Sequence, residues 1–306
     1  MVTNPPSLRI QSPSARARSL ARLRRGLSIL LAAAALSAGA RASEPLRVQV
    51  PSLDAPGGTA LQQPGFWFDA GPGPRAAVLL LHGCGGPYGR GSALSERLVE
   101  YAARLQALGL SVLVTDSLSP RGERSLCTQP IGQRLVTQLH RRLDALGALQ
   151  WLAVQPGVDA ARLGLIGWSH GGTAVLGATN LGHAEVAAAA VKPAFAVAFY
   201  PGCNDERRRG HRPAAPLLLL LGGADDWTPA APCLGLADEA TEPRPQREVY
   251  ADAHHGFDGT APLRLWREVP NGAQPGQGVH LGGHPGAREA AQARLARFLV
   301  EVGAVR

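Results

Sequence analysis

The chain has 306 residues, 45% of them hydrophobic, which is enough for one large α/β domain or two small ones. Its formal net charge is +8, but residues 1–42 hold seven arginines and neither Asp nor Glu, so the rest of the chain is close to neutral. This distribution argues against nucleic-acid binding, which needs a basic surface that neutralises phosphates. We interpret the remaining basic run, Arg207–Arg209, as a solvated loop because two acids precede it.

The first 42 residues have the three parts of a secretory signal peptide. Several arginines precede the apolar run "LSILLAAAALSAGA", and a small-residue cleavage site ends at Ala42. The run of 14 residues at 27–40 is shorter than the roughly 20 needed to span a bilayer, so we expect cleavage and no stable membrane anchor. The pair Arg24-Arg25 leaves twin-arginine export open. We therefore expect a signal peptide over 1–42 and a periplasmic or secreted protein.

Short apolar runs bounded by turn residues recur after the Pro- and Gly-rich segment 43–75, which holds a first strand at "RVQV". Continuous apolar runs are typical of strands buried on both faces of a parallel sheet. They lie at 75–83, 109–116, 162–168, 194–200 and 216–223.

Helical spacing of apolar residues separates these runs. It covers 92–107, 131–153, the small-residue stretch after Ser169, and 286–303, where the last helix is expected to cover an edge of the sheet. Alternating strands and helices predict an α/β fold with right-handed crossovers. We expect a long Gly- and Pro-rich excursion at 259–285. Without an internal repeat or long linker, we expect a single domain over 43–306.

The stretch "LGLIGWSHGGTAV" frames Ser169 with Gly167 and Gly171 in the pattern G-x-S-x-G. A buried strand followed at once by a helix places that serine on a sharp turn, where a nucleophile is exposed. The alternative is a glycine-rich turn with a serine of no function, because a five-residue pattern also occurs by chance.

A nucleophilic serine needs a base, a group that orients the base, and donors for the oxyanion. Asp225 and Asp226 follow the run "PLLLLLGG", and His254 and His255 follow another short strand. The order Ser, Asp, His is that of an α/β-hydrolase triad. Either aspartate could instead cap the next helix, and we expect one of them to cap it while the other acts in the triad. Either histidine could be a loop residue with no role.

The segment "LLLHGCGG" predicts a flexible loop that follows a strand. Its Cys84 backbone amide and the amide of His170, directly after the nucleophile, are the candidate oxyanion-hole donors. The alternative is an ordinary glycine-rich turn. Arg121, also after a strand end, could meet an anionic substrate or stabilise its own loop.

The set "LHGCGG", "GWSHGG", "GGADDWTPAAPC" and "YADAHHGFD" resembles the dienelactone hydrolase family of the α/β-hydrolase superfamily over about residues 75–303. The resemblance implies a mostly parallel central sheet with helices on both faces. The family's patterns favour Asp225 through Gly222 and Pro229, and His255 through Ala253 and Phe257. Dienelactone hydrolases proper use a cysteine nucleophile where this chain has Ser169. The resemblance therefore implies the acyl-transfer machinery but not a lactone substrate.

Four cysteines lie in the expected mature chain, and an even count in an exported protein predicts two disulfides. No spacing typical of a zinc site accompanies them, so we expect no metal. If the strands that precede them are neighbours, Cys84 pairs with Cys127 and Cys203 pairs with Cys233.

The sequence thus predicts a serine hydrolase that cleaves small-molecule carboxylic esters or lactones through an acyl-enzyme on Ser169, with Asp225 and His255, and that needs no cofactor. One alternative is a peptidase-like hydrolase, although only about 30 residues lie between the signal peptide and the hydrolase core, too few for a substrate-filtering propeller. The other is a non-catalytic binding protein on the same scaffold.

Overall fold

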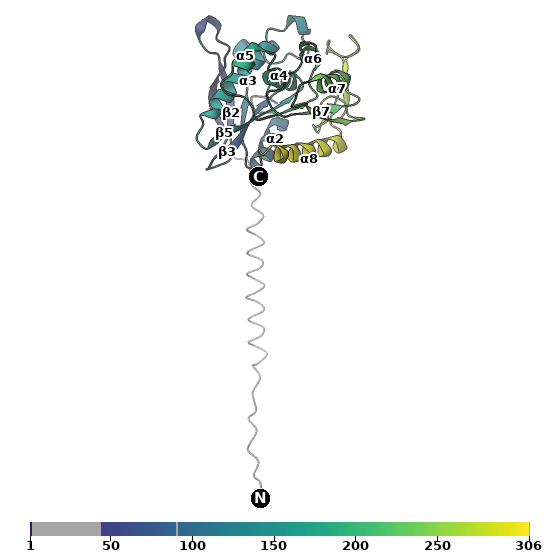
Figure 1. Cartoon of the computed structure of the whole chain (residues 1–306). Helices are drawn as coiled ribbons and strands as arrows, with labels where there is room; N and C mark the ends of the chain where they lie inside the picture. Colours follow the sequence, from purple (N-terminus) through teal and green to yellow (C-terminus); the bar gives the residue numbers. More distant parts are fainter. Residues whose placement is uncertain (2–43, 90, 306) are drawn as a thin grey trace. The chain divides into compact units, whose positions relative to one another are not determined.

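The computed structural model describes Met1, residues 44–89 and residues 91–305. Apart from Met1, the expected signal peptide lies outside the described residues. Residues 44–305 are part of one compact unit, which is drawn in Figure 1. In the described part of the chain, no helix is long and apolar enough to cross a membrane.

A central sheet of eight strands has the order β1-β2-β4-β3-β5-β6-β7-β8. The pairs β1·β2 and β2·β4 are antiparallel, and every later neighbouring pair is parallel. The strands are β1 Leu46–Pro51, β2 Gln62–Phe68, β3 Arg75–Leu81, β4 Ser111–Thr115, β5 Val158–Trp168, β6 Phe195–Phe199, β7 Leu217–Gly222 and β8 Gln246–Tyr250. The predicted mostly parallel sheet is confirmed.

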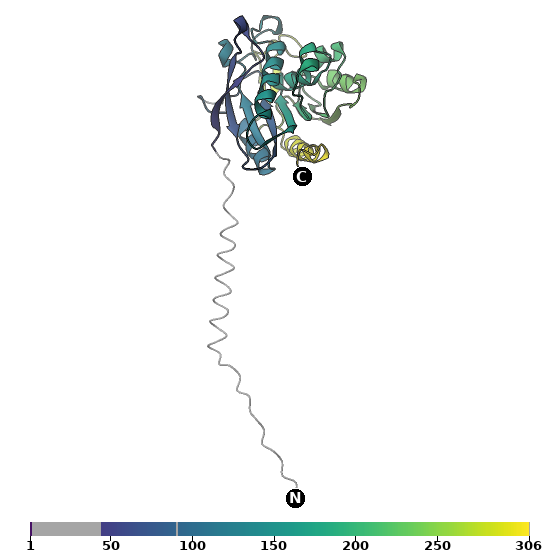
Figure 2. The same cartoon turned by 60° about the vertical axis from the view of Figure 1, so that its left-hand side comes forward.

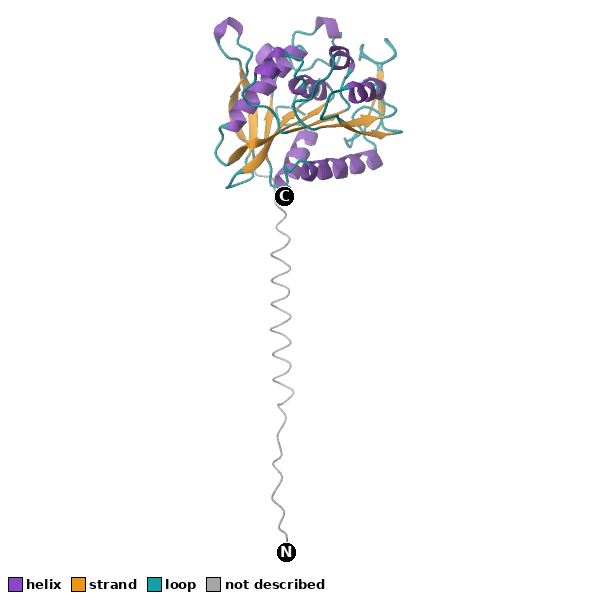
Figure 3. Ribbon diagram, in the orientation of Figure 1, coloured by secondary structure: helices purple, strands orange, loops and turns teal. Residues whose placement is uncertain are grey.

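Helices cover both faces of this sheet (Figures 2 and 3). They are α2 Glu96–Ala107, α3 Gln138–Ala153, α4 His170–Thr179, α5 Ala184–Ala188, α6 Asn204–Arg209, α7 Ala230–Glu239 and α8 Pro285–Glu301. On β3, Val78 and Leu80 pack with α2 and α8, whereas Leu79 and Leu81 pack with α3 and α4. Because both faces are buried, the strand reads as a continuous apolar run.

The structure differs from the sequence-based expectation at several elements. The predicted helix at 131–153 begins only at Gln138, and α8 packs on a face of the sheet beside α2 rather than at its edge. Strand β2 was not predicted, and the run Arg207–Arg209 ends a short helix, α6, instead of lying in a loop. The excursion 259–285 contains a hairpin of β9 Arg264–Trp266 and β10 Val279–Leu281.

Candidate active site

Ser169 lies on the turn between β5 and α4, with φ +54° and ψ −118°. Residues that carry a side chain rarely adopt this backbone conformation, which costs of order 1–3 kcal/mol. The flanking glycines allow the close approaches around it. A Cβ on Gly167 would lie 2.3 Å from the carbonyl oxygen of Gly171, and a Cβ on Gly171 would lie 2.0 Å from that of Leu81. The strained turn leaves Ser169 partly exposed at the carboxyl end of β5.

His255 lies in the segment after β8, and its imidazole is buried between Ser169 and Asp225. Its Nε2 is 2.8 Å from Ser169 Oγ, and its Nδ1 is 2.8 Å from Asp225 Oδ2. The carboxylate accepts a hydrogen bond from Nδ1–H, which leaves Nε2 free to accept the serine proton. The structure therefore brings together the three residues that the sequence singled out, with geometry suited to general-base catalysis.

Asp225 also caps its own turn, because Oδ1 accepts hydrogen bonds from the backbone amides of Trp227 and Thr228, both at 2.9 Å. Burial alone would raise the pKa of this carboxyl, but its electrostatic interaction and hydrogen bond with His255, together with the two amides, hold it below its usual value. Asp225 is therefore ionised at neutral pH and can stabilise a protonated imidazole.

The alternative acid, Asp226, and the alternative base, His254, both lie beside His280 instead of contacting Ser169. Asp226 Oδ2 is 2.7 Å from His280 Nδ1, and Asp226 Oδ1 accepts the His280 amide at 2.8 Å. The ring of His254 lies 5.3 Å from that of His280. These residues anchor β10 beside the site.

Sequence reasoning missed Thr228, whose side chain lies beside Asp225 and His255. Its Oγ1 lies 3.0 Å from Asp225 Oδ2, 3.0 Å from His255 Nδ1 and 3.0 Å from the carbonyl oxygen of Tyr200. The Tyr200 carbonyl and the ionised Asp225 carboxylate can only accept, so the single hydroxyl proton serves one of them at a time, and the lone pairs of Oγ1 remain able to accept part of the Nδ1–H bond. The only sequence signal was the position of Thr228 just before Pro229.

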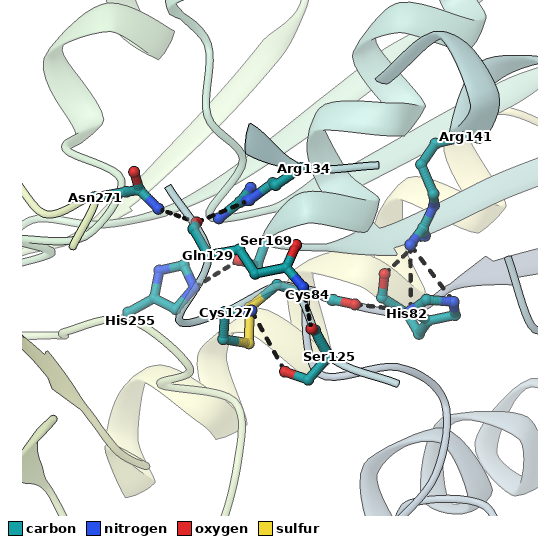
Figure 4. Close-up of a disulfide and its surroundings, with 11 residues drawn as sticks. His82, Cys84, Ser125, Cys127, Gln129, Arg134, Arg141, Ser169, His255 and Asn271 are labelled. Carbon is teal, nitrogen blue, oxygen red and sulfur yellow. Dashed lines mark hydrogen bonds between the residues drawn. A yellow bond between two sulfur atoms is a disulfide. The ribbon is translucent and has the colours of Figure 1, made fainter. Parts of the chain in front are cut away.

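The two candidate oxyanion donors lie in elements that flank Ser169. His170 is the first residue of α4, where backbone amides have no partner inside the helix. Cys84 follows β3, and a Cβ on its neighbour Gly83 would lie 3.7 Å from Ser169 Cβ. Cys84 is disulfide-bonded to Cys127 (Figure 4). The Cys84 carbonyl also accepts the Leu126 amide at 2.8 Å. The loops after β3 and β4 are thus joined beside the serine.

A buried arginine supports the loop that carries Cys84. Arg141 Nη2 donates to the carbonyl of His82 at 2.8 Å, two residues before Cys84 (Figure 4). Burial lowers the pKa of Arg141 to about 10, so the guanidinium still carries its charge at neutral pH. Burial, followed by this charge, also lowers the pKa values of His82 and His170 well below their usual range, which keeps both imidazoles neutral.

Among the described residues, no hydrogen bond joins the remaining sequence candidates to Ser169, Asp225 or His255. Cys203 is joined to Cys233 at the start of α7. The guanidinium of Arg121 donates to Asp54 Oδ2 at 2.6 Å and to Asp144 Oδ2 at 2.9 Å. These ion pairs favour a loop-stabilising role for Arg121 over binding of an anionic substrate, because its guanidinium is already paired with two carboxylates.

Two loops meet beside Ser169 and His255. The carbonyl of Gln129, in the loop after β4, accepts Asn271 Nδ2 at 2.8 Å and Arg134 Nε at 3.2 Å (Figure 4). Asn271 Oδ1 in turn accepts the Ile131 amide at 3.1 Å. The excursion 259–285 is thereby fastened to the loop that carries Cys127.

Comparison with known proteins gives one family and a set of similar folds. The model of the dienelactone hydrolase family matches residues 72–299, whereas no curated protein matches the chain. A dienelactone hydrolase-like promiscuous phosphotriesterase from metagenomic libraries is 19% identical, with a TM-score of 0.59 over 85% of this chain and 99% of the other. Thermogutta terrifontis esterase 2, phosphorylated by paraoxon, is 16% identical, with a TM-score of 0.57 over 87% and 96%.

A third similar structure is Porphyromonas gingivalis dipeptidyl peptidase 4, which is 16% identical with a TM-score of 0.58 over 85% of this chain. The present chain spans 36% of the length of that peptidase. At these identities the likenesses show a common fold, and the chemistry has to be argued from the site.

Proposed function

This chain belongs to the dienelactone hydrolase family, and from that premise we propose that it is a serine hydrolase that cleaves carboxylic esters or lactones through an acyl-enzyme on Ser169. The family is one of hydrolases, which sets aside the alternative of a non-catalytic binding protein.

Acylation begins when Ser169 Oγ attacks the ester carbonyl carbon and His255 Nε2 takes the hydroxyl proton. The 2.8 Å separation of these two atoms is the observation that carries the proposal. Asp225 holds the imidazole by its Nδ1–H and stabilises the imidazolium that forms. The resulting tetrahedral intermediate carries a negative charge on the former carbonyl oxygen.

The backbone amides of Cys84 and His170 donate to that oxyanion. Such donors act most strongly when they are fixed before the reaction, and losing one typically costs roughly 3 kcal/mol of transition-state stabilisation. The Cys84–Cys127 bridge and the Arg141 contact to His82 support this role, because both restrain the loop that carries the Cys84 amide.

Collapse of the intermediate expels the alcohol, which receives its proton from His255. A water molecule then attacks the acyl-enzyme with the same base, and the acid leaves as Ser169 regains its proton. In a lactone the alcohol remains attached to the acyl group, so a single hydroxy acid is released after deacylation.

The test is labelling of the folded protein with a fluorophosphonate, which reacts with an activated serine. The adduct should map by mass spectrometry to the peptide that contains Ser169, and Ser169→Ala should not be labelled. Hydrolysis of p-nitrophenyl esters but not of peptide p-nitroanilides would separate an esterase from a peptidase. Folded protein that forms no adduct on Ser169 would refute the proposal.

The proposed location is the periplasm or the extracellular space. Removal of residues 1–42 would leave a single domain over 43–306. Disulfides persist in oxidising compartments, and both bridges, Cys84–Cys127 and Cys203–Cys233, are in keeping with that location. Amino-terminal sequencing of the exported protein tests the cleavage site, which should follow Ala42.

A further inference from the structure

A buried carboxylate lies three residues after His255, in the segment 251–258 that we call the histidine loop. Asp258 is fully buried. Its Oδ2 accepts the indole Nε1–H of Trp168 at 2.8 Å, and its Oδ1 accepts the hydroxyl of Tyr200 at 2.6 Å. The guanidinium of Arg97 lies 3.4 Å from Oδ1. Because a buried charge is costly unless it is paired and hydrogen-bonded, these contacts make its burial tolerable.

Both hydrogen-bond donors to Asp258 adjoin the triad. Trp168 is the last residue of β5 and directly precedes Ser169. Tyr200 follows β6 with φ +37°, and its ring centre is 4.6 Å from that of His255. The same carboxylate therefore contacts the strand that ends at the nucleophile and the ring that packs against the base.

The backbone of the histidine loop is held from the other side by the segment that leads into α8. The amide of Gly282 donates to the His255 carbonyl at 3.0 Å, and that of His284 donates to the Phe257 carbonyl at 2.9 Å. Arg288 Nη1, in α8, donates to the Asp258 carbonyl at 2.6 Å. The Asp258 carboxylate completes this set by tying the loop to β5 and to Tyr200.

We propose that Asp258 is a positioning residue that keeps His255 within hydrogen-bonding distance of Ser169. This inference rests on the proposed function. Asp258 touches neither the substrate nor the reacting atoms, and it acts through Trp168 and Tyr200. A displacement of about 1 Å between reacting groups can cost roughly 10²-fold in rate, so a modest loosening of the histidine loop has a large effect.

Asp258→Asn tests the proposal with little change in volume. The amide oxygen can still accept from Trp168, but the charge that pairs with Arg97 and one carboxylate acceptor are lost. We expect kcat for a p-nitrophenyl ester to fall about 10²-fold while KM changes less than about twofold. Tyr200→Phe keeps the ring against His255 and removes one hydrogen bond, so it should lower kcat by a smaller factor, about 5-fold.

Asp144→Asn is the matched control. Asp144 is also fully buried and accepts hydrogen bonds from an arginine, Arg121, and from Ser52 at 2.6 Å, but it contacts none of the triad residues. Its substitution should lower the melting temperature without lowering kcat. A purely structural Asp258 would behave in the same way, so equal kcat values for Asp258→Asn and wild type would overturn the proposal.

The low-field proton resonance of His255 Nδ1–H, hydrogen-bonded to Asp225, gives a second readout without substrate. Asp258→Asn should shift or broaden it, whereas Asp144→Asn should leave it unchanged. An unchanged resonance in folded Asp258→Asn and Tyr200→Phe would contradict the proposal. If the wild type neither reacts with a fluorophosphonate nor hydrolyses esters, the proposed function fails, yet this resonance still decides whether Asp258 positions His255.

Discussion

At the scale of single residues, Asp225 uses its two carboxylate oxygens for different purposes. Oδ1 caps the turn through the amides of Trp227 and Thr228, while Oδ2 faces His255. From the sequence, one aspartate was expected to cap and the other to act in the triad. The structure instead gives both contacts to Asp225 and leaves Asp226 with His280. Sequence spacing could not separate the two because they are adjacent in the chain.

Asp225→Asn should therefore be far more damaging to catalysis than Asp226→Asn. An asparagine at 225 can still accept from the turn amides, but it cannot stabilise an imidazolium and favours the wrong His255 tautomer, so kcat should fall by about 10³- to 10⁴-fold. Asp226→Asn should change kcat less than about threefold, since it loses only an exposed pair with His280. Steady-state kinetics with one ester measures both, and the opposite ranking would assign the acid role to Asp226.

Thr228 allows a finer test of how the imidazole is held. Thr228→Val keeps the shape but removes the hydroxyl that lies 3.0 Å from both Asp225 Oδ2 and His255 Nδ1. Loss of one such hydrogen bond is worth about 1 kcal/mol, so kcat should fall about 5-fold with KM unchanged. Thr228→Ser should restore most of the rate. If serine and valine at 228 behave alike, the hydroxyl has no part in positioning the base.

At the scale of elements, the inner parallel strands could be predicted from the sequence, because burial of both faces gives each strand a continuous apolar run. Strand β2 escaped prediction because Pro64 and Gly65 interrupt its apolar pattern, although the strand pairs with β1 and β4. The Cβ of any residue at 65 would lie 2.8 Å from Val48, so this glycine marks a close approach within the sheet. Such reasons for a glycine depend on neighbours that are distant in sequence.

In the site, as in the sheet, only the features with a local sequence signal could be predicted. The turn at Ser169 and the order Ser, Asp, His belong to short motifs and could be predicted. The contacts of Thr228, Arg141 and Asp258 join different elements, and no local pattern marks them. They follow from tertiary packing, which sequence spacing does not report.

The two disulfides allow a comparison between a bridge that includes a candidate oxyanion donor, Cys84, and a bridge that does not. They close loops with sequence separations of 43 and 30 residues, and chain entropy gives each roughly 4 kcal/mol of stabilisation. Replacing Cys84 and Cys127 together by alanine should also free the loop of the Cys84 amide and lower kcat about 10-fold in protein that remains folded.

The matched control is the double replacement of Cys203 and Cys233 by alanine, which removes a bridge between the segment after β6 and α7. It should lower the melting temperature by a similar amount but leave kcat within about twofold of wild type. Parallel measurement of melting temperature and kcat in both double variants tests this. Equal effects on kcat would show that the first bridge adds stability alone.

At the scale of the whole molecule, several buried histidines make the fold sensitive to acid. Burial is the largest cause that lowers the pKa values of His82, His170 and His211, so all three are neutral in the folded protein near pH 6. In the unfolded chain they bind protons near the ordinary value of about 6.5. The unfolded state then binds more protons than the folded state, and the free energy of unfolding falls as pH falls below that value.

His211 offers the clearest test because it lies outside the triad and its pKa is lowered to about 4. Neither of its ring nitrogens has a hydrogen-bond partner among the described residues, so His211→Phe removes a titrating group without removing a bond from that set. The stabilisation from the neutral ring is complete above pH 6.5 and is lost as pH falls to about 4, a change of about 3 kcal/mol. Between pH 7 and pH 4.5, the variant should therefore lose about 2 kcal/mol less than wild type. Urea unfolding at the two pH values measures this difference, and equal losses in both proteins would mean that His211 is protonated without cost in the folded state.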